Sequence, residues 1–320
     1  MILDMLELKG GLYPAVPTLY NRKTGSIDKD ANRRFAMNLR KKPIDGVAVW
    51  VHTGRGLFLS NEERHFILKL WREILPEKVI IAGVGSKMKK VKFGDIDAYV
   101  DDAKAMAQEA KVEGADYLLA FPPTPLKKLV RGEDLIIRYH KELGQIGLPV
   151  ILFYLYEKAG GLSYSEEILK RLFSLDHVVG IKLATLNSVM RMQDLSEFIR
   201  EKFPDKILIT GEDRMFGYSL IRGCQAALVG LGSVLPELQK KMLESYFREK
   251  PSFISLMKMV DLLAEALFVE PMEGYIERIE KALSLMKIIP EECVYDPYGP
   301  GITDTDKVRI RKTLEQLEAL

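Results

Sequence analysis

Short apolar runs alternate with longer amphipathic segments along most of this 320-residue chain. Eight runs have the length and composition of buried strands: 11–17, 46–51, 78–84, 116–121, 148–153, 178–182, 206–211 and 226–231. Amphipathic helices are expected after them, at about 28–41, 61–75, 95–113, 133–146, 165–174, 188–202, 213–222 and 236–248. Eight strand–helix repeats match the α/β class, and a closed TIM (β/α)₈ barrel better than an open doubly wound sheet.

Residues at the segment boundaries support this pattern. Ser60 and Glu63 have the spacing of a capping box, and Gly114 and Gly147 fall where helices are expected to end. No Gly-x-Gly-x-x-Gly follows the first strand, and Gly83-Val84-Gly85 is only a fragment of it, which argues against a dinucleotide-binding fold.

The last part of the chain lacks strand-like runs. Helices are expected at 252–269, 272–288 and about 304–319, with no strand between the first two. The sequence therefore predicts two domains, a catalytic barrel over 1–250 and a helical domain over 251–320.

Composition excludes several classes of protein. A formal charge of +2 gives no support for nucleic-acid binding, and two cysteines provide neither a disulfide framework nor a zinc cluster. No apolar run reaches the ~18 residues of a membrane span. The first residues carry acids where a signal peptide needs basic ones. We expect a cytoplasmic protein that does not bind membranes.

Lys182 follows Val179, Gly180 and Ile181 at the end of an apolar strand. Burial there favours the neutral amine, which is a nucleophile able to form a Schiff base with a carbonyl. A structural lysine that reaches solvent or pairs with a carboxylate is the alternative. Catalytic groups of (β/α)₈ barrels lie at the carboxyl ends of strands, and Lys182 ends the sixth predicted strand, which favours a chemical role.

Short motifs in the expected order resemble the family of dihydrodipicolinate synthases and N-acetylneuraminate lyases, almost from end to end. The segments that carry the resemblance are Tyr13–Thr18, Gly46–Arg55, Ile81–Gly85, Leu148–Leu152, Gly180–Lys182, Thr210–Asp213 and Leu267–Pro271. The resemblance implies a class I lyase that needs no cofactor, acts on 2-keto acids such as pyruvate, and assembles as a dimer or tetramer.

The resemblance also implies roles for individual residues. Lys182 matches the Schiff-base lysine, Thr53 and Gly54 match the motif that grips the substrate carboxylate, and Lys158 matches an arginine that often binds a distal carboxylate. Thr53 has the alternative of a turn residue that stabilises its own loop.

The usual proton relay of the family is missing. Phe153 occupies the position of the relay tyrosine, and the segment after strand four contains Thr124 where a second tyrosine is common. His52 and Arg55 replace the threonine and the glutamate of the carboxylate motif, and Leu183 replaces the acidic residue that commonly follows the lysine. Dihydrodipicolinate synthase activity itself is therefore not expected.

Several residues could replace the relay. His52 has an ordinary pKa suited to acid–base work near neutral pH, with a structural loop histidine as its alternative. Tyr156 lies past the end of strand five, with packing under a loop as its alternative. Glu212 and Asp213 stand at the top of strand seven and could act as a base. Tyr154 should point away from the barrel axis, because side chains alternate along a strand.

Basic residues gather in the loops expected around the active-site mouth: Arg55, Lys87, Lys89, Lys90, Lys92, Lys127, Lys128, Arg131 and Lys158. If all of them face the mouth, they form a positive funnel for a substrate with more than one acidic group. Solvated loop charges are the alternative.

These features predict a Schiff-base lyase, aldolase or dehydratase for a 2-keto acid, with sugar-derived acids among the candidates. A non-catalytic family member that binds a keto acid or anionic metabolite as a sensor or scaffold is the alternative, supported by the missing relay. A metal-dependent barrel enzyme lacks a convincing ligand cluster.

Overall fold

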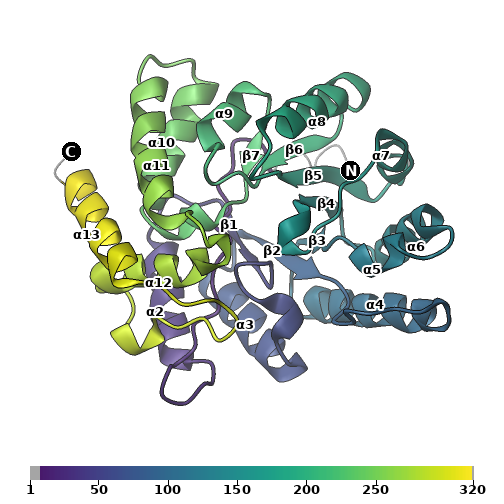
Figure 1. Ribbon diagram of the computed structural model, residues 1–320, viewed down its shortest axis with the longest axis horizontal. Coiled ribbons are helices and arrows are strands. Elements are labelled where there is room, and N and C mark those ends of the chain that lie inside the picture. Colours follow the sequence, from purple (N-terminus) through teal and green to yellow (C-terminus); the bar gives the residue numbers. More distant parts are fainter. Residues whose placement is uncertain (1–7, 319–320) are drawn as a thin grey trace.

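Parallel strands form the centre of the molecule, and helices surround them (Figure 1). The structure is a computed structural model that describes residues 8–318. The acidic segment 1–7 and the predicted end of the last helix at 319 lie outside the described residues.

The sheet has seven strands, each paired in parallel with the next one along the chain. They are β1 (Gly46–Val49), β2 (Val79–Val84), β3 (Tyr117–Ala120), β4 (Val150–Leu155), β5 (Val178–Ala184), β6 (Ile207–Thr210) and β7 (Ala226–Ala227). All seven coincide with predicted strands, although β7 is much shorter than expected.

The predicted first strand, 11–17, is a segment that closes the barrel between β7 and β1. Tyr13 N donates to Ala227 O at 2.8 Å, and Ala48 N donates to Pro14 O at 2.8 Å. Leu12 and Ala15 form isolated bridges to the two strands rather than a regular strand. Pro14 and Pro17 lack the N–H that a continuous ladder needs. The prediction of a (β/α)₈ barrel is confirmed.

Helices follow the strands close to the predicted ranges. They are α2 (Lys29–Arg40), α3 (Asn61–Ile74), α4 (Ile96–Val112), α6 (Gly132–Gly144), α7 (Glu166–Phe173), α8 (Val189–Lys202), α9 (Phe216–Ile221) and α10 (Pro236–Phe247), with a short α5 (Thr124–Lys127) after β3. The Ser60–Glu63 capping box is present, with Glu63 N donating to Ser60 Oγ at 3.2 Å and Ser60 N donating to Glu63 Oε2 at 2.8 Å.

Because side chains point alternately to the two faces of each strand, the buried residues form two separate cores. Phe153 packs inside the barrel with Ile151 and Leu155, whereas Tyr154 packs in the layer between strands and helices. There the Tyr154 hydroxyl donates to Ser163 Oγ at 3.1 Å. The predicted outward direction of Tyr154 is confirmed, and β4 therefore presents a phenyl ring rather than a phenol to the barrel interior.

Three further helices follow the barrel: α11 (Phe253–Leu267), α12 (Tyr275–Leu285) and α13 (Asp304–Glu318). They lie together on one side of the barrel, at the left of Figure 1. A 3₁₀ turn, Met272–Gly274, precedes α12 and points the start of that helix toward the carboxyl ends of the strands. Within residues 8–318 no helix is both long and apolar enough to cross a membrane.

Candidate active site

Lys182 projects from β5 into the barrel and is only 6% exposed. The strand continues two residues beyond it, to Ala184, so the lysine lies near the strand end rather than at it. In the sheet it pairs with Phe153 of β4, and its Nζ lies 4.4 Å from the centre of the phenyl ring. Gly211 flanks the lysine stem, and a Cβ at that position would lie 2.4 Å from Lys182 Cε.

Burial sets the protonation state of this lysine. Removal from water lowers the pKa of Lys182 to about 8, and the carboxylates of Asp213 and Glu212 oppose the shift. A substantial fraction of the amine is therefore neutral near physiological pH. The apolar surroundings predicted from the strand sequence are confirmed, because all seven residues of β5 are buried.

The two acids after β6 have different surroundings. Glu212 accepts hydrogen bonds from Thr185 Oγ1 at 2.8 Å and Leu186 N at 3.0 Å. These bonds hold its carboxylate against the loop after β5. Asp213 accepts one from Leu231 N at 2.7 Å and lines the same cavity as Lys182. Burial raises the pKa of Asp213 to about 7. Of these two acids, Asp213 lines the cavity, whereas Glu212 binds backbone amides and does not line it.

The loop after β1 brings Thr53 to this cavity by a tight turn that continues through Gly54. Trp50 and Arg55 have left-handed backbone conformations, with φ of 58° and 54°. A Cβ on Gly54 would lie 3.0 Å from Val16 O, so a larger residue would force the turn apart. In the described part of the chain, the Gly54 amide donates to no protein acceptor. It is thus available to a ligand.

A tyrosine from α12 completes the site. The Tyr275 hydroxyl lies 3.0 Å from Thr53 Oγ1 and 3.1 Å from His52 Nδ1, and its ring stacks on Phe268. Burial raises the pKa of Tyr275 well above its usual value, so it is a neutral phenol. Sequence reasoning missed this residue, since nothing in its local sequence distinguishes it from a packed helix residue.

His52 lies at the entrance of the cavity and is partly exposed. Burial and the positive charges of Arg55 and Lys182 lower the pKa of His52 to about 3, although Glu273 Oε2 stands 3.7 Å from Nε2. This direction runs against the expectation that His52 titrates near neutral pH. A neutral imidazole bonded to Tyr275 orients that phenol instead.

Arg55 is committed to an ion pair. Its Nε lies 3.2 Å from both carboxylate oxygens of Asp296, and both side chains are buried. The pair joins the β1 loop to the segment before α13. The sequence predicts that Arg55 binds substrate. In the structure its guanidinium is paired with Asp296, a partner that the sequence did not reveal.

The two remaining candidates, Tyr156 and Lys158, lie on the loop after β4 in different surroundings. Tyr156 lines the cavity with Lys182, and burial raises its pKa to about 12. Lys158 is exposed and lines neither this cavity nor the larger one beside it. Tyr156 therefore lies on the cavity wall, whereas Lys158 is not placed to meet a substrate in this structure.

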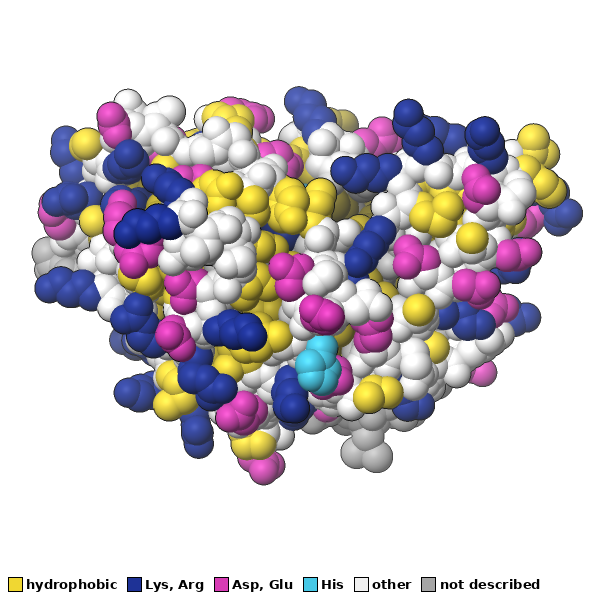
Figure 2. Space-filling model, turned by 90° about the horizontal axis from the view of Figure 1, so that it is seen from below, with side chains coloured by type: hydrophobic (Ala, Val, Ile, Leu, Met, Phe, Trp, Pro, Cys, Tyr) yellow, Lys and Arg dark blue, Asp and Glu magenta, His cyan; other side chains and the backbone are white. Residues whose placement is uncertain are grey.

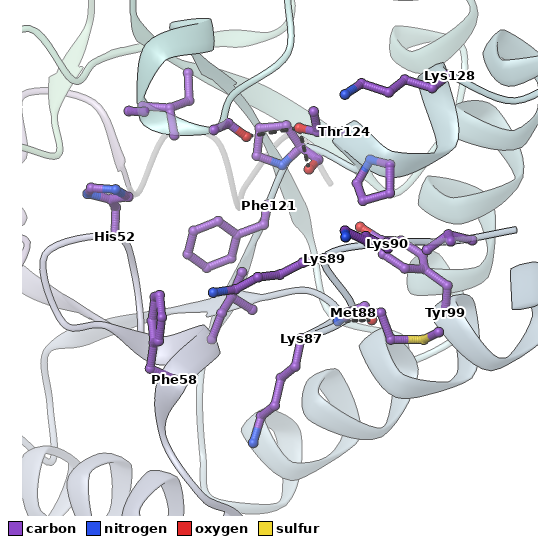
Figure 3. A pocket seen from close by; sticks show the side chains of 18 of the residues that line it. His52, Phe58, Lys87, Met88, Lys89, Lys90, Tyr99, Phe121, Thr124 and Lys128 are labelled. Carbon is purple, nitrogen blue, oxygen red and sulfur yellow. Dashed lines mark hydrogen bonds between the residues drawn. The ribbon is translucent and has the colours of Figure 1, made fainter. Parts of the chain in front are cut away.

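Two adjoining cavities lie at the carboxyl ends of the strands. The inner one, of about 40 Å³, contains Lys182, Thr53, Asp213, Tyr156 and Tyr275 in its lining. The outer one, of about 560 Å³, extends over the loops after β1, β2 and β3 (Figure 3). His52, Leu155 and Ala159 line both, so the two cavities meet.

Only part of the predicted basic funnel faces this opening. The residues that line the outer cavity are Arg55, Lys87, Lys89, Lys90 and Lys128. Lys92, Lys127, Arg131 and Lys158 do not, and Arg131 pairs with Asp134 at 2.9 Å. The condition for the full funnel, that all nine face the mouth, is therefore not met. Basic and acidic side chains are mixed across the face drawn in Figure 2.

The described side chains contain no group of three or more His, Cys, Asp or Glu residues that could hold a metal ion. The side chains that line the inner cavity offer an amine, the two carboxyl groups of Asp213 and Glu273, two phenols, an imidazole and the Thr53 hydroxyl.

Comparisons with known proteins agree with this arrangement. An uncharacterised DapA-like lyase of Thermococcus onnurineus is 26% identical over 97% of this chain and 99% of its own length. A probable mitochondrial 4-hydroxy-2-oxoglutarate aldolase of Emericella nidulans is 23% identical over 74% of this chain and 73% of its own. A solved structure of a monomeric dihydrodipicolinate synthase variant shares the fold with a TM-score of 0.83, at 19% identity over 99% of both chains.

The family assignment rests on a match over nearly the whole chain. The model of the dihydrodipicolinate synthetase family matches residues 8–317, which includes the barrel, Lys182 and the helices that carry Tyr275. The chain belongs to the dihydrodipicolinate synthetase family.

Proposed function

We propose that this protein is a lyase of the class I aldolase type that forms a Schiff base between Lys182 and a 2-keto acid. The observation that carries the proposal is the placement of a buried lysine with a lowered pKa on the wall of a cavity that also contains a carboxyl group and two phenols. The named relatives, a DapA-like lyase and a probable 4-hydroxy-2-oxoglutarate aldolase, support the same class of reaction.

In the proposed reaction the substrate carboxylate binds the Gly54 amide and the Thr53 hydroxyl. Thr53 lines the inner cavity and Gly54 is the next residue of the same turn, so both can donate charge-assisted hydrogen bonds to a carboxylate there. This contact directs the keto carbon toward Lys182, and the small volume of the cavity leaves room for little more than a pyruvyl group. Tyr275 holds the Thr53 hydroxyl in place through the 3.0 Å hydrogen bond.

The neutral amine attacks the keto carbon, and loss of water gives a protonated imine. In the cleavage direction a base takes the proton from the hydroxyl on C4, the C3–C4 bonding electrons move toward the iminium nitrogen, and an aldehyde leaves. The resulting enamine takes a proton at C3, and water then releases the shortened keto acid. Addition is the reverse sequence of steps.

Phe153 has no hydroxyl, so other groups must transfer the protons. We assign the exchange with the imine nitrogen to Asp213, whose raised pKa lets it both give and take a proton near neutral pH. Tyr156 and Tyr275 are the phenols that line the cavity, and they act as the donors toward the substrate oxygen. Thus a carboxyl group and phenols from other elements replace the hydroxyl that Phe153 lacks.

Borohydride reduction in the presence of pyruvate tests the proposal. A reduced adduct should appear on Lys182 by peptide mass spectrometry, and Lys182→Ala should abolish it. Lys158→Ala is the matched control, because this lysine lies on a neighbouring loop outside both cavities. Absence of an adduct with pyruvate and with longer keto acids would contradict the proposal.

A non-catalytic sensor or scaffold is the second candidate, and the apolar ring of Phe153 beside Lys182 favours it. An adduct that forms but never turns over with any aldehyde or 4-hydroxy-2-keto acid would support this reading. Steady-state release of pyruvate from such acids would exclude it.

We also propose, from the family resemblance, a cytoplasmic protein that assembles as a dimer or tetramer, with domains at 1–250 and 251–320. Light scattering of the purified protein measures the assembly directly.

A further inference from the structure

The outer cavity differs from the inner one in both size and lining. At about 560 Å³ it falls within the range of cavities that hold small organic ligands, whereas the inner one fits a pyruvyl group. Because the two meet at His52, Leu155 and Ala159, a substrate bonded to Lys182 would extend outward into the larger space.

Hydrogen-bonding groups suited to a sugar chain are scarce in the outer cavity. No Asp, Glu, Asn or Gln side chain lines it. Of its three hydroxyl side chains, Ser86 donates to Asp102 Oδ2 at 2.7 Å and Thr124 donates to Gly160 O at 2.9 Å. Arg55 and His52 are likewise engaged, with Asp296 and Tyr275. A polyol would leave most of its hydroxyl groups unpaired here.

Apolar side chains make up much of the remaining wall. Phe58 and Phe121 offer aromatic faces, and Leu57, Met88 and Leu155 lie between the loops. Figure 3 shows the Phe121 ring near the middle of the cavity, between His52 and the lysines of the loop after β2. Such a wall stabilises a flat apolar group through burial.

The polar groups of the cavity that remain are the hydroxyl of Tyr99, whose side chain is buried, and ammonium groups. Lys89 Nζ lies 5.1 Å from the centre of the Phe58 ring. Lys90 and Lys128 make no ion pair or hydrogen bond to protein within residues 8–318. In Figure 3 the amine ends of these three lysines approach the cavity, whereas Lys87 runs away from it to bond Leu59 O.

We propose that the outer cavity is the binding site for the part of the substrate beyond the pyruvyl unit, and that this part is an apolar, aromatic group ending in an anion. The inference rests on the proposed lyase function. It replaces a sugar-derived substrate by an aryl one: addition of the pyruvate enamine to an aryl aldehyde forms the C3–C4 bond, and the aldehyde oxygen takes a proton to become the C4 hydroxyl.

Rates of addition to pyruvate test the substrate class. Three aldehydes are compared: 4-carboxybenzaldehyde, neutral benzaldehyde and the polyol D-glyceraldehyde. We expect kcat/KM to fall in that order, with the carboxylate contributing about tenfold, as expected for two or three partly exposed charge pairs. Equal or faster reaction of D-glyceraldehyde would overturn the proposal.

Binding of an unreactive probe tests the cavity without chemistry. Calorimetry on Lys182→Ala measures terephthalate against neutral terephthalamide. Replacing both Lys90 and Lys128 by Gln should weaken terephthalate about tenfold and leave terephthalamide within twofold. Lys92→Gln and Lys158→Gln are the controls, since neither residue lines the cavity. Equal loss in the controls, or no loss in the double variant, would overturn the proposal.

The two experiments separate the two proposals. Terephthalate binding that depends on Lys90 and Lys128, without any pyruvate adduct on Lys182, would support the cavity assignment and reject the lyase. A pyruvate adduct without lysine-dependent terephthalate binding would reject the cavity assignment and leave the lyase.

Discussion

The hydroxyl of Tyr275, on the first turn of α12, lies 3.0 Å from the hydroxyl of Thr53 in the loop after β1. These residues are separated by 222 positions in the chain. The hydrogen bond places a helix outside the barrel repeats in contact with the proposed carboxylate site, so the C-terminal helices contribute to the candidate active site.

Tyr275→Phe should therefore lower turnover. The substitution keeps the ring stacked on Phe268 but removes the hydroxyl that orients Thr53 and His52. We expect kcat to fall about 100-fold, the typical effect of a lost acid–base group, while borohydride trapping of pyruvate persists. Unchanged turnover, measured with any substrate that the wild type cleaves, would remove Tyr275 from the mechanism.

Imine formation should depend on pH through Lys182. Its pKa is lowered to about 8, so the neutral amine is scarce at pH 6 and predominates above pH 8. The initial rate of trapping with pyruvate should rise over this interval and then level off. A rise that continues to pH 10 would indicate an ordinary lysine.

Asp213→Asn should move that pH profile in a defined direction. The carboxylate of Asp213 stabilises the ammonium form and raises the pKa of Lys182 against the effect of burial. Removing the charge lowers the lysine pKa further, so the midpoint should shift to lower pH by about one unit or more. Turnover should nevertheless fall, because the proton carrier is lost. A shift to higher pH would contradict the assigned interaction.

Gly211→Ala should displace the Lys182 side chain from its position. The added Cβ would lie 2.4 Å from Lys182 Cε and 2.8 Å from Leu183 O, and the lysine stem must move. We expect trapping to slow at least tenfold, with a stability loss of about 1–3 kcal/mol. Gly94→Ala is the control, since nothing lies within 4 Å of its added Cβ. Wild-type trapping in Gly211→Ala would show that the lysine tolerates the displacement.

The Arg55–Asp296 pair should prove structural. Asp296→Asn leaves a buried guanidinium without its charge partner, which costs about 3–5 kcal/mol of unfolding free energy. The double variant Arg55→Met with Asp296→Leu should recover much of that loss. Denaturant titration of the wild type and these variants measures their free energies of unfolding. If Arg55 instead binds substrate, Arg55→Met should raise KM without a comparable loss of stability.

Much of the barrel follows from local sequence. Apolar runs bounded by helix signals located all seven strands of the sheet, and the capping box at Ser60 is present as predicted. The first run departs from the prediction because Pro14 and Pro17 interrupt its ladder, so that it closes the barrel by separate hydrogen bonds. Periodicity identifies buried runs, but pairing depends on where N–H groups are available.

The candidate site, like the barrel, has features that the sequence predicts and features that only the tertiary structure shows. The sequence by itself determined the family resemblance, the choice of Lys182 as the proposed nucleophile and the loss of the hydroxyl at Phe153, since these depend on residue type and position within one strand. Only the tertiary structure decided which polar groups meet them. It brought Tyr275 to Thr53, assigned Arg55 to Asp296 and Glu212 to the loop after β5, and selected Lys89, Lys90 and Lys128 from the basic loops. The physical reason is that such contacts join segments far apart in the chain, and burial, which shifts the pKa values of Lys182 and Asp213, exists only after those segments have packed.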